Sequence, residues 1–216
     1  MNCIIANSRD CSREGVLAYL QDTWQAYAAA SADALQHTLQ QYSDGLLLYY
    51  IPFSKADAAL LRGISKKYKR IKIIAFVDSH NAYYLRQCIH EKIAAWMSSN
   101  TPFAGISLAM QAVAHGRPYH CDEIQQLMEC CRMKPGCKSL FNKKELELLH
   151  YIGQNNTTSE IAALLSSTEK TIYGIRKRMM KKTGTQSTAT VLYYAIAQGY
   201  LQCHSNKKAT LRAAFL

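Results

Sequence analysis

Five residues that could contact a large anion share one face of a predicted helix over residues 169–182. They recur at i, i+3, i+4, i+7 and i+11 and are Lys170, Tyr173, Gly174, Lys177 and Lys181. Lysines pair with phosphates and can donate hydrogen bonds to guanine. Gly174 costs about 1 kcal/mol of helix propensity relative to alanine, which predicts that something large approaches the backbone there. The face favours binding to nucleic acid over the alternative of a solvated basic surface.

The charge of the whole chain supports the same class of partner. The chain has 26 Lys and Arg residues against 15 Asp and Glu, a formal net charge of +11. Residues 1–132 hold 13 basic and 11 acidic side chains, whereas residues 133–216 hold 13 basic and 4 acidic ones. Because a strongly basic segment attracts polyanions, the C-terminal part is the one predicted to contact nucleic acid.

Capping signals predict further helices around the basic one. Asn142 with Glu145, and Thr157 with Glu160, have the spacing of capping boxes. The predicted helices cover approximately residues 143–153, 158–165, 169–182 and 188–199. A short helix, a tight turn and a longer basic helix form a helix-turn-helix, whose second helix enters the DNA major groove.

An apolar stripe on the basic helix lies opposite its charged face. Ile172, Ile175 and Met179 recur at i, i+3 and i+7, the spacing of a side that packs on other helices. The two stripes together predict a helix that is anchored on one side and open to a ligand on the other.

Residues 140–201 resemble the C-terminal DNA-binding domain of the LuxR/NarL family. The motifs are Lys144-Glu145-Leu146-Glu147-Leu148-Leu149, Thr157-Thr158-Ser159-Glu160-Ile161-Ala162, Thr168-Glu169-Lys170-Thr171-Ile172 and Lys182-Thr183-Gly184. The resemblance covers the whole tetrahelical domain and implies that the protein binds double-stranded DNA.

The resemblance also implies residue roles. The implied base-reading residues are Tyr173, Gly174 and Lys177. The implied phosphate contacts are Thr158, Ser159, Lys170, Thr171, Arg178 and Lys181. Tyr173, Ile175 and Thr183 depart from residues common in the family, which predicts a different operator sequence. Tyr193, Tyr194 and Gln198 on the final helix resemble the family's dimer surface, with burial in the core as the alternative.

Short apolar runs alternate with amphipathic segments through the first half of the chain. Strands are predicted over residues 3–6, 25–30, 46–50, 71–77 and 93–97, and helices near 12–21, 31–42, 54–68, 80–90 and 102–115. This rhythm indicates strand-helix-strand units. The predicted fold is an α/β doubly wound five-stranded parallel sheet of the flavodoxin-like kind, followed by an all-α tetrahelical helix-turn-helix domain.

The first half also resembles the receiver domain of response regulators, over about residues 2–118. Arg13-Glu14-Gly15, Asp44 and Asn100-Thr101-Pro102 carry the resemblance. A phosphorylatable receiver needs an acidic pair for Mg²⁺, a phosphoacceptor aspartate, a hydroxyl and a lysine.

The positions of that phosphorylation site hold other residue types here. They are Asn7, Ser8, Tyr49 (or Tyr50 after a one-residue slip), Val77 and Ser98. Asp10 and Asp78 lie beyond their strand ends and are poor substitutes. The sequence therefore predicts a degenerate receiver-like domain that is not phosphorylated on aspartate.

Two roles remain open for this domain. It could be a constitutive dimerisation scaffold, or it could sense a ligand or protein in an altered pocket lined by Asn7, Tyr49 and Val77. The basic run Lys66–Lys72 predicts a solvated loop, with DNA phosphates or an acidic partner as alternatives. The predicted segments are a receiver-like domain over 1–118, a linker with a short helix over 119–139, a DNA-binding domain over 140–203 and a basic tail over 204–216.

The eight cysteines do not indicate a disulfide scaffold, because the chain starts without an export signal. The cysteines at 121, 130, 131 and 137, near His120, lack paired metal-ligand spacing, so buried thiols are expected rather than a zinc site or a redox switch. The sequence shows no membrane span, which predicts a cytoplasmic protein.

No paired carboxylates, glycine-rich phosphate loop or nucleophile–base spacing indicates catalysis. We therefore expect no enzyme activity, no catalytic residue and no cofactor. The sequence predicts a homodimeric DNA-binding transcriptional regulator that works without aspartyl phosphorylation. The alternative is an interaction module that titrates a partner regulator or senses a ligand.

Overall fold

The computed structural model describes residues 1–54, 56–78, 82–133 and 139–202. The chain divides into two compact units, Met1–Pro135 and Gly136–Leu216, which are considered separately. The predicted tail over 204–216, Cys137 and part of the predicted linker lie outside the described residues. No helix among the described residues has both the length and the hydropathy needed to cross a membrane.

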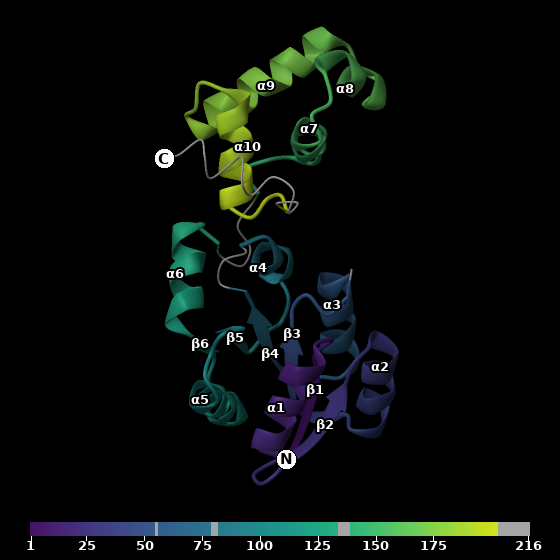
Figure 1. The fold of residues 1–216 in the computed structure, drawn as a ribbon, viewed down its shortest axis with the longest axis vertical. Helices are drawn as coiled ribbons and strands as arrows, with labels where there is room; N and C mark the ends of the chain where they lie inside the picture. The colour runs from purple at the N-terminus through teal and green to yellow at the C-terminus, as the bar shows by residue number, and fades with distance from the viewer. Residues whose placement is uncertain (55, 79–81, 134–138, 203–216) are drawn as a thin grey trace. The chain divides into compact units, whose positions relative to one another are not determined.

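The first unit contains a parallel sheet with strand order β2-β1-β3-β4-β5-β6 (Figure 1). The strands are β1 (Asn2–Ala6), β2 (Gln25–Ala29), β3 (Asp44–Tyr50), β4 (Arg70–Val77), β5 (Ala95–Ser98) and β6 (Tyr119–His120). All neighbouring pairs are parallel, with Ala6 opposite Tyr49 and Tyr49 opposite Ala75. The doubly wound fold predicted from the alternating pattern is confirmed.

The sheet has one strand more than the five that were predicted. Tyr119 and His120 pair with Ala95 and Trp96, so the sheet extends into the segment expected to be a linker. The helix that follows buries Ile124 against the same core as Trp96. Two residues are too few to show the alternating pattern that predicts a strand. Tyr119 and His120 form a strand only because they pair with β5.

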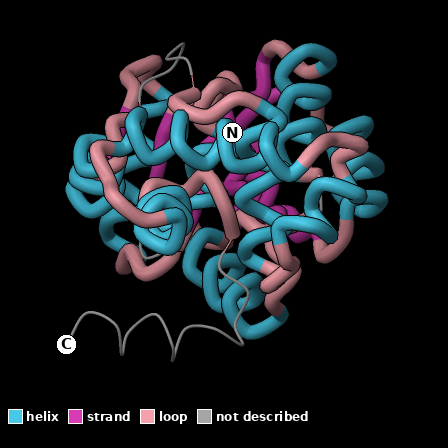
Figure 2. The backbone as a smooth tube through the Cα atoms, turned by 90° about the horizontal axis from the view of Figure 1, so that it is seen from above, coloured by secondary structure: helices cyan, strands magenta, loops and turns pink. Residues whose placement is uncertain are grey.

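Helices cover both faces of this sheet (Figure 2). They are α1 (Asp10–Leu20), α2 (Ala32–Gln41), α3 (Asp57–Lys67), α4 (Ala82–Cys88), α5 (Phe103–Ala114) and α6 (Asp122–Cys130). One core joins α2, α3, α4 and α6 to strand residues such as Leu47 and Ile73. The other joins α1 and α5 to the alternate residues, such as Leu46 and Ile74. This two-sided burial explains why the strands read as continuous apolar runs.

The described residues of the second unit form four helices close to the predicted positions. They are α7 (Lys143–Gly153), α8 (Thr158–Leu164), α9 (Glu169–Thr183) and α10 (Thr188–Ala197). Both predicted capping boxes are present, at Asn142 with Glu145 and at Thr157 with Glu160. Gly184 caps the C-terminus of α9, and its φ of 69° is the left-handed conformation typical of a glycine that terminates a helix.

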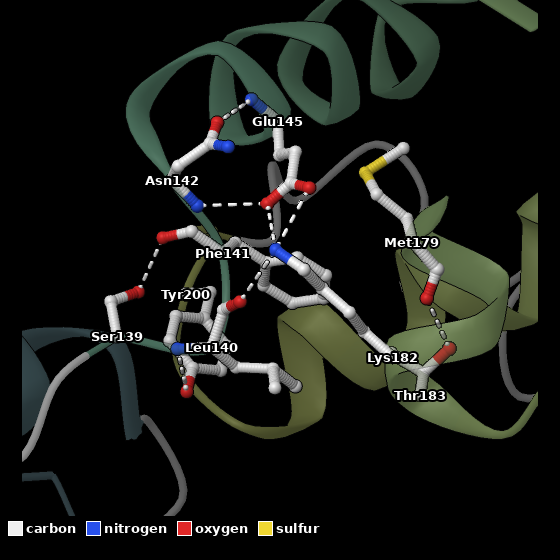
Figure 3. A network of polar contacts seen from close by, with 9 residues as sticks. All are labelled: Ser139, Leu140, Phe141, Asn142, Glu145, Met179, Lys182, Thr183 and Tyr200. Atoms are coloured by element: carbon white, nitrogen blue, oxygen red, sulfur yellow. Dashed lines mark hydrogen bonds and ion pairs between the residues drawn. The ribbon is translucent and has the colours of Figure 1, made fainter. Parts of the chain in front are cut away.

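A buried carboxylate connects the start of α7 to the end of α9 (Figure 3). Glu145, whose side chain is 3% exposed, accepts hydrogen bonds from the Lys182 ammonium at 2.7 and 2.9 Å and from the Asn142 backbone N–H at 2.9 Å. Lys182 also donates to the Leu140 carbonyl at 3.2 Å. The ion pair therefore fixes the C-terminal end of α9 against the entry to α7.

We predict that Lys182→Met destabilises the second unit by about 1–3 kcal/mol, because it leaves the Glu145 carboxylate buried without its cation. Removing the cation of a fully buried pair would cost more free energy of unfolding, but the Lys182 side chain is 37% exposed. Urea unfolding followed by circular dichroism measures the change. Lys181→Met is the control: Lys181 is exposed and has no carboxylate partner among the described residues, so its cost should stay within about 0.5 kcal/mol. Equal costs would contradict a structural role for the pair.

Candidate nucleic-acid interface

The apolar and basic stripes of α9 lie on opposite sides of the helix, as predicted. Ile172 and Met179 are fully buried and Ile175 is 6% exposed, all in the core of the second unit. The residues on the opposite side, including Lys170, Gly174, Lys177 and Lys181, are exposed. The core thus determines which side of α9 faces outward.

The cations of this outward side are not neutralised within the described part of the second unit. Lys170, Lys177, Arg178 and Lys181 are exposed, and none of them forms an ion pair with a described carboxylate. Lys182 differs, because its ammonium is bound to Glu145. These cations lie on the side of α9 opposite the apolar stripe. This is the arrangement expected of a surface that binds a polyanion.

Gly174 leaves open space in the middle of this charged side. A Cβ atom built on Gly174 would meet no other atom within 4 Å, and its φ is not in the positive range. Neither packing nor backbone conformation requires glycine here. The helix backbone is therefore open to approach at this position.

Tyr173 borders the basic stripe and is 57% exposed. The guanidinium carbon of Arg176 lies 5.9 Å from the centre of its ring, within the range of a cation–π contact. Arg176 Nε is the one buried side-chain nitrogen or oxygen without a hydrogen-bond partner among the described residues. The i+3 spacing of Tyr173 and Arg176 on one helix is the sequence signal for this contact.

The remaining expected phosphate contacts lie at the starts of α8 and α9. Ser159 is exposed, Thr158 is half-buried, and Thr171 is exposed with its hydroxyl 2.9 Å from that of Thr168. In α8, the hydrogen bond from the Thr157 backbone N–H lowers the pKa of Glu160. This carboxylate completes the helix cap.

The two tyrosines of α10 that were expected at a dimer surface differ in exposure. Tyr193 is 38% exposed, whereas Tyr194 is half-buried and packs against the core, with its ring centre 6.4 Å from that of Phe141. Of these two tyrosines, Tyr194 is thus part of the core and Tyr193 is more accessible.

In the first unit, the residues at the positions of a receiver's phosphorylation site lie at the carboxyl ends of neighbouring strands. Asn7 and Ser8 follow β1, Tyr49 lies in β3, Val77 ends β4 and Ser98 ends β5. Ser8 is exposed. The other four are at most 2% exposed.

The polar groups among these residues are bonded to other parts of the protein. The buried Tyr49 hydroxyl donates to Asp57 Oδ1 at 2.7 Å, and burial, followed by this hydrogen bond, raises the pKa of Tyr49. Asn7 accepts from the Arg9 backbone N–H at 2.9 Å and donates to the Ser12 hydroxyl at 3.0 Å. Sequence reasoning missed Asp57, which lies eight residues beyond Tyr49.

The described residues contain no group of three or more His, Cys, Asp or Glu side chains arranged to hold a metal ion. Asp10 pairs with Arg13 at 2.6 Å and its side chain is 81% exposed. Asp78 is exposed beyond the end of β4. Cys121 is half-buried, Cys130 is exposed and Cys131 is buried, so burial of thiols is correct for Cys131 and wrong for Cys130.

Comparison with known proteins extends the motif resemblance to the whole chain, although no family model matches it. The oxygen regulatory protein NreC of Staphylococcus aureus is 21% identical over 216 residues, which is 94% of this chain and 100% of NreC. The regulatory protein SdiA of Escherichia coli is 36% identical over 61 residues, covering 28% of this chain and 25% of SdiA.

The fold has solved counterparts. RcsB of Salmonella enterica serovar Typhimurium, bound to the promoter P1flhDC in the presence of the phosphomimetic BeF3-, matches with a TM-score of 0.65. It is 21% identical and the match covers 91% of this chain and 98% of RcsB. These comparisons show that the chain is similar to LuxR/NarL-type response regulators and that it shares the fold of RcsB, a parallel α/β domain followed by a helical domain with a helix-turn-helix.

Proposed function

We propose that the protein is a transcriptional regulator that reads double-stranded DNA with α9, acts as a homodimer and does not depend on aspartyl phosphorylation. The observation that carries this proposal is the outward side of α9, where exposed cations without described carboxylate partners surround an open glycine. The promoter-bound state of RcsB, which has the same fold, supports DNA as the polyanion. The mechanism is positioning on DNA and needs no catalytic group or cofactor.

Base reading is assigned to Tyr173, Gly174 and Lys177. Lys177 supplies a donor for guanine O6 or N7, and Tyr173 contacts a thymine methyl group or a phosphate. Thr158, Ser159, Lys170, Thr171, Arg178 and Lys181 contact phosphates. Thr158 and Ser159 begin α8 and Thr171 lies in the first turn of α9, where backbone N–H groups also favour anions.

The chemistry at the carboxyl edge of the sheet supports independence from phosphorylation. A phosphoryl acceptor must be an accessible carboxylate next to Mg²⁺, but Tyr49 is buried and its hydroxyl is bound to Asp57. The same burial argues against a ligand among Asn7, Tyr49 and Val77. A dimerisation scaffold is therefore the favoured role for the receiver-like domain.

Selection of genomic DNA fragments on the purified protein, without a phosphodonor, tests the proposed function. Discrete fragments with inverted repeats are expected, because a two-fold dimer reads two related half-sites. Weak binding without sequence preference would favour the alternative, a module that titrates a partner regulator.

Two lysine variants test the assigned roles. Lys177→Ala should cost about 1–3 kcal/mol at one base position and relax specificity there. Lys181→Ala should weaken all sequences alike and reduce the salt dependence of binding, because it removes a phosphate contact. Competition binding with operator variants at several salt concentrations measures both. Identical behaviour of the two variants would contradict the assignment.

Gly174→Ala should separate stability from binding. It should raise the free energy of unfolding by roughly 0.5–1 kcal/mol through helix propensity and weaken operator binding by blocking the close approach of DNA. Gly63→Ala in α3 is the matched control, because Gly63 is also exposed and a Cβ there meets nothing within 4 Å. It should stabilise similarly and leave binding unchanged. Operator affinity of Gly174→Ala equal to wild type would show that no close approach occurs.

A phosphodonor with Mg²⁺ should leave both the intact mass and the operator affinity unchanged. Intact-mass spectrometry and a parallel binding assay check this. If the mass of a phosphoryl group were gained on an aspartate, the claim would be wrong, and Asp10→Asn and Asp78→Asn would locate the acceptor.

A further inference from the structure

The first unit contains a basic cleft at the amino ends of β4 and β5, the edge of the sheet opposite the degenerate phosphorylation site. It has a volume of about 630 Å³. Its lining includes Arg62 and Lys66 of α3, Lys69 of the following turn, and Glu91 and Lys92 of the segment between α4 and β5. Volumes of roughly 300–1,000 Å³ are typical of small-molecule sites.

One wall of the cleft is held by an ion pair. Arg62 Nη2 lies 2.7 Å from Glu91 Oε1, and Arg62 Nε lies 3.2 and 3.4 Å from the two carboxylate oxygens. The Glu91 side chain is only 6% exposed. The hydrogen bonds that Arg62 donates to Glu91 raise the pKa of Arg62. The pair joins α3 to the segment before β5 and neutralises the one carboxylate in the lining.

Unlike Arg62, the lysines of the cleft have no carboxylate partner among the described residues. Lys66, Lys69 and Lys92 are exposed, and no carboxylate pairs with them in the part of the chain that is described. Nearby lysines are engaged elsewhere: Lys67 lies 5.1 Å from the centre of the Tyr68 ring, and Lys72 donates to the carbonyls of Val113 and Ala114 at the end of α5. Three lysines from three different segments thus line the cleft without a carboxylate partner among the described residues.

The cleft accounts for the positive charge of the first unit. The unit Met1–Pro135 has a net charge of +3, from 14 basic and 11 acidic side chains. Arg62, Lys66, Lys69 and Lys92 together with Glu91 also contribute +3, so the rest of the unit has a net charge of zero. A basic surface that served only solubility would not be gathered in one hollow.

We propose that this cleft binds a small molecule that carries two or more linked phosphate groups, such as a nucleoside diphosphate or triphosphate. Lysine is a common phosphate ligand that acts as a point charge. Three lysines on separate segments match a chain of phosphates better than a single phosphate, and the volume leaves room for the rest of such a molecule. The site is concave and has the volume of a small-molecule site, which favours this ligand over the backbone of duplex DNA.

Isothermal titration calorimetry of the full-length protein at physiological salt tests the site with ATP, ADP and pyrophosphate as probes. All three should bind, and adenosine and inorganic phosphate should bind at least about tenfold more weakly. The double variant Lys69→Ala/Lys92→Ala should lose about tenfold or more in affinity for ADP, equal to roughly 1.4 kcal/mol. Its thermal unfolding should match that of the wild type, because both lysines are exposed and unpaired among the described residues.

Two controls distinguish a built site from general attraction of anions. Lys67→Ala removes a charge beside the cleft but outside its lining, and Lys177→Ala/Lys181→Ala removes two charges from α9. Both should bind ADP like the wild type. Absence of ADP binding, or equal losses in the cleft variant and either control, would overturn the proposal. Operator binding is a separate measurement, so failure of the site and failure of the DNA-binding proposal can be told apart.

Discussion

The buried carboxylate of Glu145 is the contact on which the shape of the second unit depends most. It completes the capping box of α7 and also binds the ammonium of Lys182, at the far end of α9. Because a buried charge is costly without a partner, the two helix ends must stay together. The pair fixes the C-terminal end of α9, while burial of Ile172 and Met179 in the core leaves the lysine side of the helix facing outward.

The receiver-like unit uses its polar residues differently. Asn7, Tyr49 and Ser98, which the sequence predicts at the positions of a receiver's phosphorylation site, are at most 2% exposed. Tyr49 and Asn7 bond to Asp57 and to the start of α1. This edge of the sheet therefore contributes to stability. The charge of the unit is gathered at the opposite edge, in the cleft proposed to bind a polyphosphate.

The two basic surfaces differ in shape, and this difference separates their proposed ligands. The stripe on α9 is a convex helix surface with an open glycine in its middle, which suits the groove and backbone of a duplex. The cleft beside α3 is concave, and its one carboxylate is neutralised by Arg62. Net charge alone would assign both surfaces the same partner, so geometry is needed to distinguish them.

The sequence by itself determined the features that depend on neighbours three or four residues away. These include the capping boxes at Asn142 and Thr157, the two stripes of α9 and the alternation of strands with helices. Only the tertiary structure decided the partner of Lys182, which lies 37 residues from Glu145, and the sixth strand at Tyr119–His120. The same holds for the bond between Tyr49 and Asp57 and for the lysines from different segments that line the cleft. Local spacing follows from the geometry of one helix or strand, whereas these contacts exist only after packing brings separate segments together.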